Sequence, residues 1–149
     1  MISIEDIKKL REETGASPVK IKKALEESGE DIEKAKELLK SWGAVKAGEK
    51  GDRQTHDGVI DFYVHPNAKS GVLLDVRCET DFVAKSPEFK NLSHEICLHI
   101  TAMAPENVEA LLAQPWVKDE TKTIKNLVEE TVAKIGENIE VKQFTRYQI

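Results

Sequence analysis

The stretch "GVLLDVRCETDFVAKSPEFKNL", residues 71–92, passes from a strand-like pattern to a helix-like one and decides the fold. Its first eight residues are rich in Val and Leu, and the turn cluster "PNAKS" (66–70) separates them from "GVIDFYVH" (58–65), which predicts a β-hairpin. Ser86 and Pro87 then begin a helix. Its buried face is expected to carry apolar residues at helical spacing, namely Phe89, Leu92, Ile96, Ile100 and Met103.

The rest of the chain adds two further helices and a strand. We expect a short helix over residues 106–113 and a stronger one over residues 122–135. The final segment, "GENIEVKQFTRYQI" (136–149), alternates as a strand does, and one of its faces would carry Ile139, Val141 and Tyr147. The order β-β-α-α-β favours a three-stranded antiparallel sheet packed with helices on one face, completed when the last strand joins the hairpin.

Residues 4–42 predict three short amphipathic helices. Each helix start has a capping residue, and these are Ser3, Ser17 (followed by Pro18) and Asp31. Each helix end has a glycine, and these are Gly15, Gly29 and Gly43. Residues 44–56 have almost no large apolar side chain and predict a linker. The fold class is therefore α+β, with a three-helix head (1–43), a linker (44–56) and an α+β core (57–149).

Charge and composition narrow the kinds of partner and compartment. Residues 1–56 carry twelve basic and twelve acidic residues, and residues 57–149 carry ten and fifteen, so neither part has the basic excess of a nucleic-acid binder. No apolar run approaches the roughly 20 residues that a membrane span needs. The opening "MISIEDIKKL" lacks the features of a signal peptide, and the two cysteines are expected to be reduced thiols. These features predict a cytoplasmic protein with a protein or small-ligand partner.

The sequence offers no convincing catalytic site. In "HEICLH" (94–99) the two histidines are five residues apart, whereas the zinc-hydrolase motif needs them four apart on one helix face. There is no phosphate-binding loop and no cysteine pair at metal-ligand spacing. Apolar neighbours would raise the pKa of Cys97 and leave this thiol inert. We therefore expect a protein that is not an enzyme and that needs neither metal nor cofactor.

Phe82 raises the question on which function depends. Thr80 can cap a helix that begins at Asp81, and an acid is stabilised at that end of a helix, so neither residue requires a functional explanation. Pro87 disfavours helical geometry at Ser86, so this first helical piece would be short. Periodicity alone places Phe82 in the core, where most phenylalanines lie.

The turn between the first two helices, "TGASPV" (14–19), forms the other candidate surface. Ala16, Pro18 and Val19 would make a modest apolar corner rimmed by Lys20 and Lys23. This corner is either a binding surface or an ordinary solvated face. The head itself is either a stabilising appendage or a protein-binding module, and its small size and tethered position favour binding.

Several motifs occur in an order that resembles one family, over nearly the whole chain. "LREETGASPVKIKKALEESGEDIEKAKELLKSWGAVKA" resembles the N-terminal domain of translation elongation factor Ts. "HDGVIDFYVH" and "GVLLDVRCETDFVAKSPEFKNL" are similar to that family's core hairpin and its T-D-F-V signature. "VAKIGENIEVKQF" is similar to the family's closing helix and strand.

The resemblance implies a function, a partner and a set of site residues. Members of the family are guanine-nucleotide exchange factors for the GTPase elongation factor Tu, and their head is a ubiquitin-associated-like three-helix domain that docks on the GTPase. The family's Asp-Phe pair matches Asp81 and Phe82, and there the phenylalanine inserts near the GTPase's magnesium site, so Phe82 would be exposed. The implied exchange wedge is Thr80, Asp81, Phe82 and Val83. The implied head contacts are Arg11, Thr14, Gly15, Ala16, Pro18, Val19 and Lys23.

The sequence also departs from the family's pattern. It is short, and an insert that typical members carry is expected to be missing near residues 106–114. Lys20 stands where the family usually has an acid, and Pro18 and Val19 stand where methionines are common. A single core half predicts a homodimer that replaces the two-half core of longer members. Two alternatives stay open: a ubiquitin-associated-like adaptor that binds proteins without exchange activity and, more distantly, a metal hydrolase.

Overall fold

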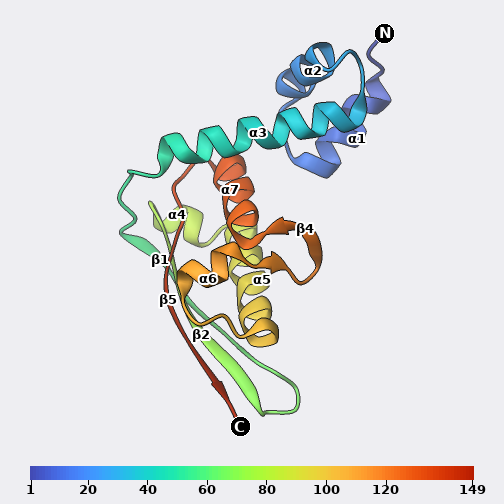
Figure 1. Ribbon diagram of the computed structural model, residues 1–149. Helices are drawn as coiled ribbons and strands as arrows, with labels where there is room; N and C mark the ends of the chain where they lie inside the picture. The colour runs from blue at the N-terminus through green and yellow to red at the C-terminus, as the bar shows by residue number, and fades with distance from the viewer.

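The computed structural model describes residues 1–149, except for the side chains of residues 44–47. Three helices open the chain, α1 (Ile4–Thr14), α2 (Pro18–Glu27) and α3 (Ile32–Lys50), and Figure 1 shows α1 and α2 beside the first half of α3. The head has its own apolar core, separate from the larger core that follows. Its buried members are Leu10, Ile21, Ala24, Leu25, Ala35 and Leu39.

Capping side chains begin the head helices where the sequence predicts. The hydroxyl of Ser3 accepts a hydrogen bond from the Asp6 N–H at 3.0 Å, and the carboxylate of Asp31 accepts one from the Lys34 N–H at 3.1 Å. Ser17 caps α2 in the same way, with Pro18 in the first turn. Gly15 ends α1 in the left-handed conformation, with φ 67°.

Helix α3 is longer than the sequence predicts. It does not end at Gly43 but continues to Lys50, so that expected end is wrong. A Cβ at Gly43 would lie 3.5 Å from the Cβ of Ala133, so α3 packs closely on a helix of the core at this point. Such tertiary packing outweighs the weak helix propensity of glycine. The predicted linker (44–56) is thus helical in backbone to Lys50, and its side chains at 44–47 lie outside the described residues.

A three-stranded antiparallel sheet forms the centre of the remaining chain. Its strands are β1 (Asp57–Val64), β2 (Ser70–Cys78) and β5 (Glu140–Gln148), in the order β1-β2-β5. The last strand joins the hairpin as predicted, and β2 lies in the middle. On β2, alternate side chains are buried under helices: Val72, Leu74, Val76 and Cys78. The fold is thus mixed α and β with helices against one face of the sheet.

Four helices and a small hairpin complete this part. The helices are α4 (Asp81–Ala84), α5 (Pro87–Met103), α6 (Val108–Ala113) and α7 (Ile124–Ile135), and the hairpin pairs β3 (Pro115–Trp116) with β4 (Asp119–Thr123). In Figure 1, α5 lies beside β1 and β2, and the end of α7 meets α3. Within the part of the chain that the structure describes, none of the helices has the length and apolar character to cross a membrane.

Two apolar residues differ from their expected positions. Helical spacing predicts Met103 on the buried face of α5, but Met103 is exposed, because it is the last residue of the helix and Ala104 then turns the chain with a positive φ of 46°. Strand alternation predicts that Tyr147 shares a face with Val141, but Tyr147 is exposed on the opposite face. The pairing of β2 with β5 shifts by one residue at Lys142, since Asp75 pairs with Gln143 and Val76 with Val141. A bulge of this kind inverts the alternation beyond it.

Candidate functional site

A short turn between β2 and α5 carries the residues of the expected wedge. Thr80 is the N-cap of α4, and its hydroxyl accepts a hydrogen bond from the Val83 N–H at 3.3 Å. The helix has only four residues, because Ser86 leaves helical geometry and caps the next helix, with Pro87 in its first turn. The predicted break between two helical pieces is confirmed.

The turn separates its side chains into an inner and an outer pair. Val83 and Ala84 are buried in the core, whereas Asp81 and Phe82 point outward. Phe82 is 83% exposed, and Asp81 forms an exposed ion pair with Lys85 at 3.4 Å. The burial of Phe82 that periodicity favours is therefore wrong, because the break at Pro87 separates α4 from the apolar stripe of α5. The exposure that the family resemblance implies is observed.

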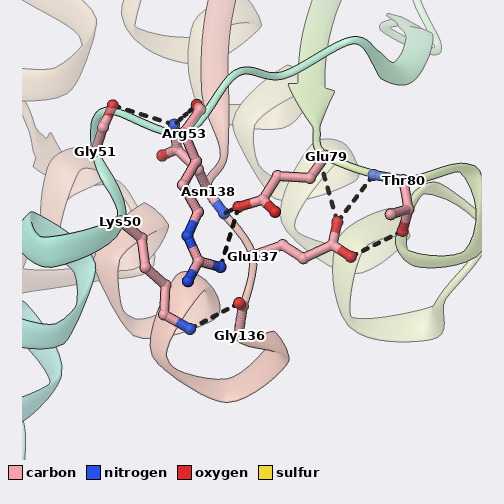
Figure 2. Close-up of polar contacts among 8 residues, drawn as sticks. All are labelled: Lys50, Gly51, Arg53, Glu79, Thr80, Gly136, Glu137 and Asn138. Atoms are coloured by element: carbon pink, nitrogen blue, oxygen red, sulfur yellow. Dashed lines mark hydrogen bonds and ion pairs between the residues drawn. The ribbon is translucent and has the colours of Figure 1, made fainter.

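A carboxylate from the other end of the chain holds the base of this turn (Figure 2). Glu137 Oε1 accepts hydrogen bonds from the backbone N–H groups of Glu79 and Thr80, at 3.1 and 3.0 Å. Glu137 Oε2 accepts a third from the Thr80 hydroxyl at 2.8 Å. The hydroxyl donates to Glu137 and keeps a lone pair for the Val83 N–H, so one residue both caps α4 and binds this carboxylate.

The neighbouring residue, Asn138, extends this contact toward the head. The Asn138 N–H donates to the side chain of Glu79 at 2.8 Å, and its side-chain amide donates to the carbonyl groups of Gly51 and Arg53, at 3.3 and 2.8 Å. Lys50, the last residue of α3, donates to the carbonyl of Gly136 at 2.7 Å. Figure 2 shows these contacts joining three segments that are far apart in the sequence. Local sequence patterns give no sign of this network, because its hydrogen-bonded partners lie 57 to 87 residues apart.

The two cysteines are buried and free, in agreement with the prediction of reduced thiols. Burial, followed by the nearby Glu137 carboxylate, raises the pKa of the Cys78 thiol to about 11. Burial raises the pKa of the Cys97 thiol to about 12. A neutral thiol is a poor nucleophile, so neither cysteine is suited to covalent catalysis.

The two histidines of "HEICLH" do not form a metal site. His94 is exposed, whereas His99 is buried with both ring nitrogens in hydrogen bonds. Its Nδ1 accepts from the Val117 N–H at 3.2 Å, and its Nε2 bonds Gln114 Oε1 at 2.9 Å. Among the residues that the structure describes, no cluster of three metal-ligating side chains occurs. His99 instead holds the β3–β4 hairpin, an element that the sequence patterns do not reveal.

The expected head contacts gather around the α1–α2 turn. Pro18 and Val19 are exposed, Ala16 is half-buried, and the Lys23 ammonium lies 5.4 Å from the ring centre of Trp42. Arg11 is exposed at the end of α1. Thr14 has a structural role, since its hydroxyl donates to the Leu10 carbonyl at 2.6 Å and accepts from the Ala16 N–H at 3.3 Å.

This head turn also lies against the core. A Cβ at Gly15 would come within 2.7 Å of Lys134 Cε, so the side chain of Lys134, near the end of α7, packs against this glycine. The end of α7 and the turn after it therefore touch the head through Lys134 and the Phe82 turn through Glu137.

Comparison with known proteins decides the family. The family model described as elongation factor TS matches residues 79–149. Elongation factor Ts of Rubrobacter xylanophilus is 40% identical over 191 aligned positions, which cover 98% of this chain and 98% of that protein. The chain belongs to the elongation factor Ts family. The protein of the same name from Coprothermobacter proteolyticus is 39% identical, with 99% of this chain and 98% of that protein covered. Membership of the elongation factor Ts family implies a role in translation elongation.

Aligned lengths show that this chain is short for an elongation factor Ts. Because 98% of its 149 residues is about 146, some 45 of the 191 positions aligned with the Rubrobacter protein are gaps in this chain. Elongation factor Ts of Aquifex aeolicus aligns over 151 positions at 43% identity, and these cover 98% of this chain but only 52% of that protein. That the missing segment belongs near residues 106–114 stays a prediction.

Proposed function

We propose that this chain is a guanine-nucleotide exchange factor that promotes GDP release from elongation factor Tu. The observation that carries the proposal is the exposure of Phe82 on a turn whose backbone is held by hydrogen bonds at its base. Leaving a large apolar side chain in water forgoes roughly 1.5–3 kcal/mol of burial energy. A preorganised aromatic anchor of this kind is typical of residues that carry binding energy at interfaces.

Phe82 would insert beside the nucleotide site of the GTPase, with the exposed Asp81 next to it, while Thr80 caps the turn and the buried Val83 anchors it in the core. Factor and nucleotide then bind with negative coupling, and the coupling is reciprocal, so incoming GTP expels the factor. This mechanism needs no covalent step, metal or cofactor from the chain, which is therefore not an enzyme in its own right. It would act in the cytoplasm, without direct contact with nucleic acid or a membrane.

The head would provide a second contact with the GTPase. We assign to it a ubiquitin-associated-like fold and a binding surface at the α1–α2 turn, where Pro18 and Val19 are exposed and Lys23 lies at the rim. Val19→Asp would weaken binding to elongation factor Tu, because it places a charge in an apolar contact. Ile4→Asp, at an equally exposed position on α1, is the matched control and would bind normally.

The central experiment measures release of a fluorescent GDP. Elongation factor Tu loaded with this nucleotide is mixed with excess unlabelled GDP and a substoichiometric amount of the protein. The wild type and Val117→Ala, which alters an exposed apolar residue elsewhere, are expected to accelerate release, and Phe82→Ala is not. Stable binding of the wild type without faster release would instead establish the adaptor alternative.

We further propose that two copies pair through the outer face of the sheet. This face, opposite the helices, carries exposed large apolar side chains on all three strands: Ile60, Phe62 and Val64 on β1, Leu73 on β2 and Tyr147 on β5. Phe62 and Leu73 are cross-strand partners. A second copy that covers this face would remove these side chains from water. A sedimentation experiment that finds only a 16.7 kDa species at micromolar concentration would refute the pairing.

A further inference from the structure

The turn Gly136–Asn138 makes contacts that go beyond closing the chain between α7 and β5. Gly136 ends α7 in the left-handed conformation, with φ 78°, so the next two side chains leave the helix axis. They point to different segments: Glu137 to the base of the Phe82 turn, and Asn138 to the backbone that follows α3.

The carboxylate of Glu137 fixes the position of the backbone at Glu79 and Thr80. One carboxylate accepts from two successive backbone N–H groups and from the hydroxyl of the capping residue. Hydrogen bonds to an ionised acceptor are shorter and stronger than neutral ones. They act on Glu79 and Thr80, so the entry angle of α4 is set by a residue outside the turn.

The contacts of Asn138 and Lys50 place the end of the head's last helix on the same turn. Asn138 binds the carbonyl groups of Gly51 and Arg53, and Lys50 binds that of Gly136. Arg53 also lies 3.7 Å from the carboxylate of Glu79, which itself accepts from the Asn138 N–H. The segment that leaves the head and the turn that carries Phe82 therefore share one support.

We propose that Glu137 is a positioning residue for nucleotide exchange and that the turn Gly136–Asn138 fixes the Phe82 turn relative to the head. Glu137 is not part of the surface that touches the partner. It acts through Thr80, by holding the exposed Phe82 in one direction while the head is bound. The predicted effect of Glu137 on nucleotide release rests on the proposed exchange function. That Glu137 holds the Phe82 turn is a statement about the free protein and does not depend on that function.

The test compares Glu137→Ala, Glu137→Gln and a control of equal charge change, Glu120→Ala, which removes an exposed glutamate from β4. In the free protein, amide hydrogen exchange is measured residue by residue. Glu137→Ala should accelerate exchange at Glu79, Thr80 and Val83 by about tenfold or more, because charge-assisted hydrogen bonds at the turn are lost. Glu137→Gln keeps an acceptor oxygen and should give a smaller change, while amides of α5 and β2 stay protected in all variants.

The second measurement is nucleotide release as a function of factor concentration. For Glu137→Ala we expect a maximal release rate lowered about tenfold, with a half-saturating concentration that changes much less, because the head still binds. Glu137→Gln should recover most of the rate, and Glu120→Ala should match the wild type.

The outcomes separate the two proposals. Unchanged amide exchange at Glu79 and Thr80 in Glu137→Ala would overturn the positioning role, whatever the wild type does to elongation factor Tu. Faster amide exchange together with a normal release rate would also overturn it. A wild type that fails to release nucleotide would refute the proposed function instead, and the amide measurement would still decide whether Glu137 holds the turn.

Discussion

Thr80 and Glu137 are 57 residues apart in the chain, yet Glu137 binds both the backbone N–H and the hydroxyl of Thr80, at 3.0 and 2.8 Å. The same hydroxyl caps α4. Local capping and a long-range contact thus meet at one residue, two positions before the most exposed phenylalanine of the chain. An exposed aromatic residue is preorganised for binding when its backbone is held from more than one direction.

Replacing Phe82 should leave the fold intact. Because Phe82 is 83% exposed, Phe82→Ala is expected to change the free energy of unfolding by less than about 0.5 kcal/mol. Phe89→Ala is the matched control, since Phe89, near the start of α5, is fully buried in the core and its truncation should cost about 3–5 kcal/mol. Urea denaturation of the two variants checks both values, and a loss of several kcal/mol in Phe82→Ala would contradict the exposed position.

Glycine at position 58 is required by the backbone. Gly58 has φ 151°, and a Cβ there would lie 2.3 Å from the Val76 carbonyl oxygen of the neighbouring strand. Gly58→Ala should therefore destabilise the protein by at least about 2 kcal/mol, because a strand would have to shift. In Gly48→Ala, by contrast, the new methyl group meets nothing within 4 Å, and the change should stabilise α3 by about 0.5–1 kcal/mol. Equal melting temperatures for the two variants would show that the close approach at Gly58 is wrong.

Sequence patterns predict those parts of this fold that depend on neighbours in the chain. Ser3, Ser17 and Asp31 are found as caps because each binds a backbone N–H three residues on. The extra residue at Lys142 exchanges the two faces of β5 from residue 143 onward, and the alternation of the sequence does not reveal this change. Nor does the glycine at position 43 reveal that packing on Ala133 continues α3 beyond it.

In the candidate site too, the features that depend on neighbouring residues can be predicted, and the long-range contacts cannot. The break at Pro87 and the cap at Thr80 follow from local rules, and they leave the direction of Phe82 open. The family resemblance implies its exposure, which the structure has. Neither the local rules nor the family resemblance points to Glu137, because its contact forms only when the fold brings the end of β2 and the end of α7 together. That head residues such as Val19 and Lys23 bind a partner stays a prediction.

Both thiols should be unreactive in the folded protein. With the pKa of Cys78 at about 11 and that of Cys97 at about 12, only about one thiol in a thousand or fewer is ionised at pH 8. We expect a thiol reagent to label native protein more than a hundredfold more slowly than an unfolded chain, in which both cysteines react at once. Rapid labelling of one thiol under native conditions would mean that its surroundings open far more readily than the buried positions imply.

The buried imidazole of His99 should make the protein less stable in mild acid. A backbone N–H can only donate, so His99 Nδ1 must be the acceptor from Val117, and the ring is neutral with its proton on Nε2, facing Gln114. Burial lowers the pKa of His99 below the ordinary value of 6.5, although the hydrogen bond to Gln114 opposes this shift. Between the lowered pKa and 6.5, the unfolded chain binds a proton at this residue that the folded protein does not. The free energy of unfolding should therefore fall as the pH falls below about 6.5.

Urea unfolding at pH 7.5 and pH 5.5 measures the effect of His99. The wild type should lose stability at the lower pH, and His99→Gln, which cannot take up a proton, should be less stable at pH 7.5 but lose less between the two values. His94→Gln, on the exposed side of the same helix, is the control and should keep the wild-type difference. If His99→Gln shows the full wild-type loss in acid, the pH dependence arises elsewhere in the chain. If the loss is reduced, the imidazole that holds the β3–β4 hairpin also limits the protein's stability in acid.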